Sequence, residues 1–196
     1  MNFELAEELN RLLTADKLED AIKLTEDKLG QEGPTGFKII LGKNLLHLTE
    51  SLTIYLDSFY RKTKDNIKVG AMYCEMNGFT INNDLWYLDA FAYDKFEGLD
   101  DLDWLADWEG ENATQERFVL TGFEDLQNVY EEYMEKENYK DEKIQSSADI
   151  CELLIILRLQ ELLKATVTKG KEKKMEWAVV PILVTAHDYD LIYRAA

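Results

Sequence analysis

The stretch SADICELLIILRLQELLKATV, residues 147–167, decides the fold, because it is the most apolar helical segment of the chain. Its apolar residues recur at the spacing of a helix. We expect this helix to be the one that packs under a β-sheet. The segments on either side of it should therefore supply the strands of that sheet.

The clearest strand signals precede this helix. LWYLDAFAYD (85–94) is apolar on both faces, which is typical of a strand in the centre of a sheet. IKVGAMYCEM (67–76) alternates with a period of two and is followed by Asn77 and Gly78, a strong hairpin signal. ERFVLTG (116–122) predicts a short strand or an extended entry to the next helix. These segments indicate a sheet built largely from neighbouring antiparallel strands.

A second hairpin is expected at the C-terminal end. WAVVPILVTA (177–186) and YDLIYRA (189–195) are the two strands, and the turn falls at His187 and Asp188. Pro181 lies inside the first strand and lacks a backbone N–H donor, which favours an edge position or a bulge. The preceding TKGKEKKM (168–175) is expected to be an exposed, basic connector.

Further helices are predicted by apolar residues at helical spacing. GQEGPTG (30–36) interrupts the helical pattern with three glycines and a proline, and is a possible boundary after an N-terminal helical hairpin. The segments expected to be helical are FELAEELNRLL (3–13), KLEDAIKLTEDKL (17–29), NLLHLTESLTIYLDSFYRK (44–62) and FEDLQNVYEEYMEK (123–136). The chain is therefore expected to be a single α+β domain, 1–196, with a mainly antiparallel sheet packed against helices and an N-terminal helical portion.

Composition limits the partners. The 196 residues carry a net charge of −17, which disfavours nucleic acid and anionic membranes and favours basic proteins. The first residues lack the basic region of a signal peptide, and no apolar run approaches the roughly 18 residues of a spanning helix. The two cysteines, Cys74 and Cys151, are expected to be buried thiols in a reducing compartment. These features predict a cytoplasmic protein that contacts no membrane.

Motifs for cofactors are absent from the sequence. Neither GxGxxG nor GxxxxGK[ST] occurs, and there is no GxSxG nucleophile elbow. We therefore expect no cofactor. Of the two histidines, His47 is expected to be structural, whereas His187 has carboxylates beside it and could act as a base or ligand.

The strands offer one possible catalytic group. If residues 85–94 are extended, Asp89 shares a face with Tyr87, Phe91 and Tyr93, so its carboxyl group lies among aromatic rings. Such surroundings raise a carboxyl pKa, as in many general acids. Glu75 could share that face from the preceding strand. The alternative is a solvated sheet face on which carboxylates are routine.

The stretch LDDLDWLADWEG (99–110) is the most acidic of the chain. It fails the spacing of an EF-hand calcium loop in either register, so no metal site is expected there. Leu102, Leu105 and Trp108 recur every third residue and, with Leu99 or Trp104, predict a helix with one apolar stripe. Residues 99–142 hold fifteen acidic and three basic residues, a net of −12, whereas residues 143–196 have a net of +1.

Such concentrated charge costs stability, and a basic partner would offset that cost. The residues expected to bind the partner are Asp100, Asp101, Asp103, Asp107, Glu109 and Glu111, with Trp104 and Trp108 as aromatic anchors. The alternative is an acidic helical surface whose tryptophans lie in the core.

The aromatic strand LWYLDAFAYD, the acidic run LDDLDWLADWEGE and the lack of a catalytic motif resemble the small acidic α+β immunity proteins of bacterial polymorphic-toxin systems. The likeness is one of general type, so no site residue is carried over. It implies an acidic surface that covers the active site of a basic toxin.

Three functions follow as expectations. The first is a non-enzymatic module that binds a basic protein, as an immunity-type inhibitor does. The second is a small hydrolase or metal-dependent enzyme that uses Glu75 and Asp89 with His187 or Asp188. The third is a regulatory subunit of a larger complex. The sequence does not determine the oligomeric state.

Overall fold

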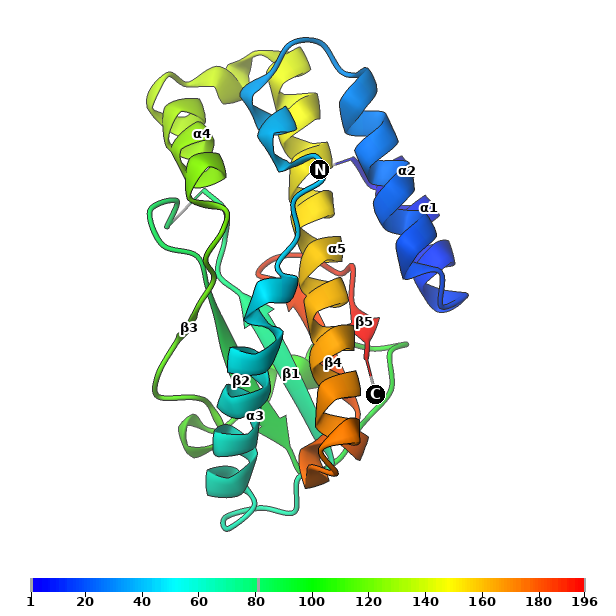
Figure 1. The fold of residues 1–196 in the computed structure, drawn as a ribbon, viewed down its shortest axis with the longest axis vertical. Coiled ribbons are helices and arrows are strands. Elements are labelled where there is room, and N and C mark those ends of the chain that lie inside the picture. The colour runs from blue at the N-terminus through cyan, green and yellow to red at the C-terminus, as the bar shows by residue number, and fades with distance from the viewer. Residues whose placement is uncertain (1, 81, 196) are drawn as a thin grey trace.

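The computed structural model describes residues 2–80 and 82–195, and these residues form an α+β fold (Figure 1). Within them are five α-helices and one five-stranded sheet. The helices are α1 (Phe3–Thr14), α2 (Leu18–Gln31), α3 (Thr49–Thr63), α4 (Glu124–Glu135) and α5 (Glu142–Glu172). The strands are β1 (Ala71–Met76), β2 (Tyr87–Tyr93), β3 (Phe118–Val119), β4 (Ile182–Ala186) and β5 (Tyr193–Arg194). The predicted fold class is confirmed.

The sheet has the order β3-β2-β1-β4-β5. Its strands pair antiparallel except at the centre, where β1 and β4 are parallel. The sequence does not predict that pairing, because the two strands are separated by about a hundred residues that include α4 and α5. α5 runs along the sheet, and the chain turns back at its end to begin β4 beside β1 (Figure 1).

Helix α5 is the predicted central helix, and it is longer than the 147–167 segment. The Asp141 carboxylate accepts hydrogen bonds from the backbone N–H groups of Lys143 and Ile144 and so caps its first turn. Most of its apolar residues are fully buried, because α5 lies against α2, α3 and β4 at once. The predicted connector at 168–175 is therefore wrong for residues 168–172, which continue α5. Lys169 and Lys171 occupy the last turn, where cations interact favourably with the helix dipole.

The first hairpin forms as predicted between β1 and β2, but its loop spans 77–86 rather than two residues. The Asn77 carboxamide closes the base of the loop. Its Oδ1 accepts from the Tyr87 backbone N–H at 2.8 Å, and its Nδ2 donates to the Leu85 carbonyl at 3.0 Å. The asparagine thus acts through its side chain instead of through a tight turn.

The second hairpin joins β4 to β5, with Asp188 in the left-handed region at φ 65°. The predicted strand at 177–186 is shorter, since Glu176–Val179 forms a 3₁₀ helix. Pro181 precedes the first residue of β4, and β4 pairs on both sides, so the expected edge position is wrong. The proline fits because only its carbonyl is used, accepting from the Met72 N–H at 2.9 Å.

The two faces of the sheet differ. Alternation along β2 turns Leu88, Ala90 and Ala92 toward the helices, and Asp89 and Phe91 toward the other side, as predicted. α3 and α5 cover the first face (Figure 1). We call the other side the open face, because no α-helix in the described part of the chain covers it.

Two further observations concern the whole chain. In the described residues, no helix combines the length and the apolar character needed to span a bilayer. Cys74 and Cys151 are buried free thiols, and burial raises the pKa of Cys74 to about 12.

Glu152 on α5 makes stability depend on pH. Tyr189 donates a hydrogen bond to its carboxyl group, and burial raises the pKa of Glu152 to about 7, with Asp149 adding to the rise. A raised pKa in the folded state means that the fold favours the protonated Glu152 carboxyl. The stabilisation that protonated Glu152 gives the fold is full below about pH 4.5 and is lost as pH rises through 7. Between pH 4.5 and 8, wild type should therefore lose about 1–3 kcal/mol of unfolding free energy relative to Glu152→Gln.

Urea unfolding at several pH values measures this difference. Glu142→Gln is the control, because Glu142 lies exposed on the same helix. Parallel pH profiles of wild type and Glu152→Gln would contradict the prediction.

Candidate functional site

Residues 99–112, which we call the acidic segment, cross the open face without forming the predicted helix. The segment holds only two short 3₁₀ helices, η3 (Asp103–Ala106) and η4 (Gly110–Asn112). The Asp101 carboxylate accepts a hydrogen bond from the Asp103 backbone N–H at 3.0 Å. Such a local bond competes with helical hydrogen bonding and favours a turn.

Trp104 anchors the acidic segment on the sheet. Its side chain is only 7% exposed and packs edge-on against Tyr93, with ring centroids 4.9 Å apart. Its indole N–H donates to the Gly98 carbonyl at 3.1 Å. Tyr93 in turn donates its hydroxyl to the Leu105 carbonyl at 2.7 Å. These contacts form a second, smaller apolar cluster on the open face.

Trp108 behaves differently. It is 45% exposed and lies against Phe91 of β2 with ring centroids 4.9 Å apart. The predicted apolar stripe is therefore wrong for Trp108, whereas Leu105 and Trp104 are buried and Leu102 packs against them. One of the two predicted aromatic anchors is in the interior, and the other is presented to solvent.

The carboxylates of the acidic segment all face solvent. None of them forms an ion pair with another residue that the structure describes, whereas many acids on the helices do, such as Glu132 with Lys136 at 2.6 Å. The six are Asp100, Asp101, Asp103, Asp107, Glu109 and Glu111. Their charge is therefore available to a partner.

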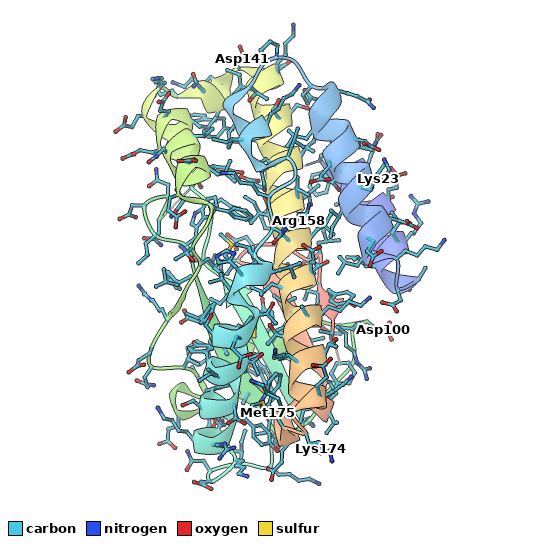
Figure 2. The ribbon with its side chains drawn as sticks, in the orientation of Figure 1. Lys23, Asp100, Asp141, Arg158, Lys174 and Met175 are labelled. Atoms are coloured by element: carbon cyan, nitrogen blue, oxygen red, sulfur yellow. The ribbon has the colours of Figure 1, made fainter. Side chains whose placement is uncertain are left out.

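The rest of the acidic 99–142 region lies elsewhere. α4 packs on the 3₁₀ helices η1 (Gly36–Ile40) and η5 (Asn138–Lys140), at the upper end of the molecule in Figure 1. Asp100 lies beside the lower half of α5 in Figure 2. The charge that is continuous in sequence is thus divided between two surfaces.

The groups of the enzyme hypothesis converge on the open face. Glu75 and Asp89 are direct partners in the β1–β2 register, and His187 follows the last residue of β4. His187 Nδ1 lies 2.6 Å from Glu75 Oε1. These three side chains line a pocket of about 310 Å³ together with Tyr87 and Phe91.

The protonation of this pocket is tuned by its neighbours. The hydrogen bond with Glu75 raises the pKa of His187. Burial raises the pKa of Asp89, while the charge of Arg117 opposes that rise. The Arg117 guanidinium lies 4.1 Å above the Tyr87 ring. Glu75 and His187 can therefore share a proton, and the Arg117 guanidinium offsets part of the negative charge beside them.

Three other features considered in the sequence are Asp188, a metal site and His47. Asp188 is 82% exposed at its side chain, with Oδ1 3.6 Å from His187 Nε2, on the outer side of the turn. In the residues that the structure describes, no three His, Cys, Asp or Glu side chains are placed to hold a metal ion. His47 has a structural contact, with Nε2 3.2 Å from Thr121 Oγ1.

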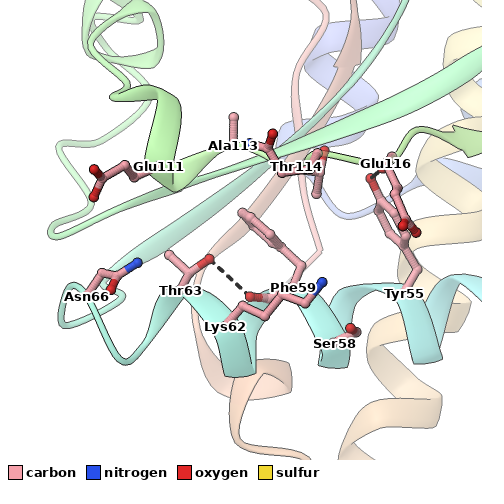
Figure 3. Close-up of a pocket in the computed structure, with 11 residues that line it drawn as sticks. Tyr55, Ser58, Phe59, Lys62, Thr63, Asn66, Glu111, Ala113, Thr114 and Glu116 are labelled. Atoms are coloured by element: carbon pink, nitrogen blue, oxygen red, sulfur yellow. Dashed lines mark hydrogen bonds between the residues drawn. The ribbon is translucent and has the colours of Figure 1, made fainter.

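A further pocket, of about 160 Å³, lies between α3 and the end of the acidic segment (Figure 3). Phe59 and Tyr55 form its apolar side, and Glu111 and Lys62 belong to its rim. The Thr63 hydroxyl donates to the Phe59 carbonyl within α3 at 3.0 Å. The Tyr55 hydroxyl donates to the backbone carbonyl of Glu116 at 2.8 Å. The hydroxyls of Tyr55 and Thr63 are therefore not free to orient a ligand.

Three residues in or beside the acidic segment were not predicted as part of a site. Asn112 is buried in its last turn, and Asp94 and Glu97 follow β2 and face the same side. The burial of Asn112 has no local sequence signal, because it depends on how the segment folds over the sheet. Comparison of the chain with known protein families, curated proteins and solved structures finds no significant match.

Proposed function

We propose that this protein is a non-enzymatic binding module that engages a basic protein through its open face. The observation that carries the proposal is the acidic segment, whose six carboxylates are exposed and form no ion pair in the described residues. A basic partner would complement this field, accelerating encounter and selecting against acidic competitors.

Two structural features support a docking surface. Trp104 fixes the segment to β2, so its carboxylates are held in place before a partner arrives, which lowers the entropy cost of binding. Trp108 adds an exposed aromatic ring, the residue type most enriched at binding hot spots. Charge and an aromatic anchor therefore occur on one surface.

The specific form of the proposal is an immunity-type inhibitor that acts in the cytoplasm on a basic toxin. It is supported by the acidic open face and by two buried free thiols. The product of a neighbouring reading frame is the partner to test first. Co-expression should give a stable complex whose association slows at high salt, and a neutral or acidic product that binds equally well would contradict this form.

Neutralising the segment should weaken binding. The variant Asp100→Asn, Asp101→Asn, Asp103→Asn, Asp107→Asn removes four exposed charges and keeps the carbonyl acceptor that Asp101 supplies to Asp103. At roughly 0.2–1 kcal/mol per exposed charge, we expect about a tenfold loss of affinity for a fluorescent oligoarginine peptide at low salt. The dependence of affinity on salt should also become less steep. Fluorescence anisotropy measures both quantities.

The matched control removes the same charge from helices. Glu7→Gln, Glu131→Gln, Glu135→Gln, Glu172→Gln also replaces four exposed acids. Its affinity should change by less than about threefold, because these charges are dispersed over the surface. Equal losses in the two variants would show that net charge alone binds the peptide, and would remove the acidic segment from the proposal.

A small hydrolase is the second candidate, favoured by the convergence of Glu75, Asp89 and His187 on one pocket. In that role His187 is the base that Glu75 orients, and Asp89 is the acid. It predicts turnover of ester or glycoside substrates that His187→Ala abolishes. If wild type and His187→Ala release product at the same rate, this candidate is excluded.

A further inference from the structure

A cavity of about 370 Å³ opens beside the acidic segment at the end of β2. One side is formed by residues 93–97 and the other by residues 104–112. It is separate from the pocket of Glu75 and His187, which shares none of its lining residues.

The cavity has an excess of negative charge. Four carboxylates line it, from Asp94, Glu97, Asp107 and Glu109, with one cation, Lys95. Lys95 Nζ lies 2.7 Å from Glu97 Oε1, which accounts for one of the four. The other three have no ion pair within the described residues. A cationic ligand would therefore be favoured by the local field.

A buried amide provides an independent observation. The Asn112 side chain lines the cavity, is only 9% exposed and forms no hydrogen bond within the described part of the chain. The carboxamide atoms are not fully enclosed, so a ligand in the cavity can reach them. A ligand with N–H donors in the cavity would satisfy the carboxamide oxygen.

The remaining wall is aromatic. Tyr93 and Trp104 line the cavity, but their polar atoms are already used, since the Tyr93 hydroxyl donates to Leu105 and the Trp104 indole N–H donates to Gly98. They therefore offer only ring surfaces. Aromatic rings beside carboxylates attract planar cations through both the ring quadrupole and stacking.

We infer that this cavity receives an arginine side chain of the basic partner, an inference that rests on the proposed function. A guanidinium is planar and carries five N–H donors, enough to reach the carboxylates of Asp107 and Glu109 and the oxygen of Asn112 together. A lysine ammonium is a compact charge that makes fewer such contacts and stacks less well. The cavity therefore favours an arginine over a lysine at this point of the interface with the basic partner.

The test uses a single blocked amino acid as the probe. Nα-acetyl-arginine amide is titrated against ¹⁵N-labelled protein, and Nα-acetyl-citrulline amide is the neutral isostere. We expect saturable shifts of the Trp104 indole and Asn112 carboxamide signals with a Kd on the order of 1–10 mM for arginine, and at least tenfold weaker binding of citrulline. Blocked lysine should bind severalfold more weakly than arginine.

Variants then assign the contacts. Asn112→Ala and the milder Glu109→Gln should each weaken arginine binding by about fivefold or more, because each removes an acceptor for a charged donor. Glu7→Gln, exposed on α1 and outside the cavity, should leave it unchanged. If Asn112→Ala does not fold, Glu109→Gln carries the test alone, since Glu109 is exposed.

The results separate this inference from the proposed function. If citrulline binds as tightly as arginine, or no signal of Trp104 or Asn112 shifts, the cavity is not an arginine site. The acidic segment still stands as a docking surface if neutralising its four aspartates weakens the oligoarginine peptide. If arginine enters the cavity while the variant Asp100→Asn, Asp101→Asn, Asp103→Asn, which keeps Asp107, binds the peptide normally, the inference holds and the charges outside the cavity are excluded from the docking surface.

Discussion

Arg158→Ala is expected to lower the free energy of unfolding by about 3–5 kcal/mol. Arg158 lies on α5 and is only 8% exposed. Its two terminal nitrogens lie 2.8 Å from Glu26 Oε1 and 2.9 Å from Glu161 Oε2. Removing the guanidinium leaves two partly buried carboxylates without their shared counter-ion.

The arginine also joins parts of the chain that are distant in sequence. Glu26 Oε1 accepts a second hydrogen bond from the Gly42 backbone N–H at 2.9 Å, so the ion pair links α2 and α5 to the turn after η1. Urea unfolding should show the loss. The control is Lys23→Ala, because Lys23 and Asp27 form an ion pair that is mostly exposed, and its unfolding midpoint should not move.

A rescue variant separates charge from packing. Arg158→Met combined with Glu26→Gln and Glu161→Gln removes both the cation and the anions it neutralises, and should recover most of the loss. A loss below about 1 kcal/mol for Arg158→Ala would contradict the prediction.

Trp104→Ala is expected to lower the free energy of unfolding by about 3 kcal/mol. The indole fills the small apolar cluster on the open face and contacts Tyr93 and Phe96. Truncation leaves a cavity and exposes Leu183 and Tyr93, so the acidic segment should detach from the sheet. Near-ultraviolet circular dichroism and urea unfolding measure both consequences.

Trp108→Ala is the matched control on the same segment. Because Trp108 is about half exposed, its loss should cost about 0.5–1 kcal/mol. Its effect on binding should be the larger one, with the oligoarginine peptide bound severalfold more weakly. If both substitutions destabilise the fold equally, the division of the two tryptophans into an internal anchor and a surface contact is wrong.

The elements governed by a local period could be predicted from the sequence. The period of two along 85–94 places Asp89 and Phe91 on the opposite face from Leu88 and Ala90, and the structure confirms it. The 147–167 helix is confirmed by the same kind of signal. Parallel pairing of β1 with β4 could not be predicted, because it depends on a long connection and leaves no trace in either strand.

The acidic segment shows where periodicity misleads. Leu102, Leu105 and Trp108 have helical spacing, but the aspartates between them bond to nearby backbone and favour turns. Burial of Trp104 then depends on a surface of the sheet that no local pattern reveals. The residues of the segment were predictable as acidic and exposed, and its conformation was not.

The candidate site was also predictable only in part. The shared face of Glu75 and Asp89 was visible in the sequence. His187 reaches Glu75 only because β4 pairs parallel with β1, which could not be predicted. Asn112 is invisible to such reasoning, since nothing local distinguishes a buried asparagine from one in an exposed turn.

The central claim is tested most directly by acrylamide quenching of tryptophan fluorescence with and without the oligoarginine peptide. All four tryptophans lie in the described residues: Trp86 and Trp177 are fully buried, Trp104 is 7% exposed and Trp108 is 45% exposed. Trp108 should therefore supply nearly all the quenching, and Trp108→Phe should abolish it. Saturating peptide is expected to shield Trp108 and so reduce this quenching. Unchanged quenching while the peptide is bound would place the cation elsewhere and contradict binding through the open face.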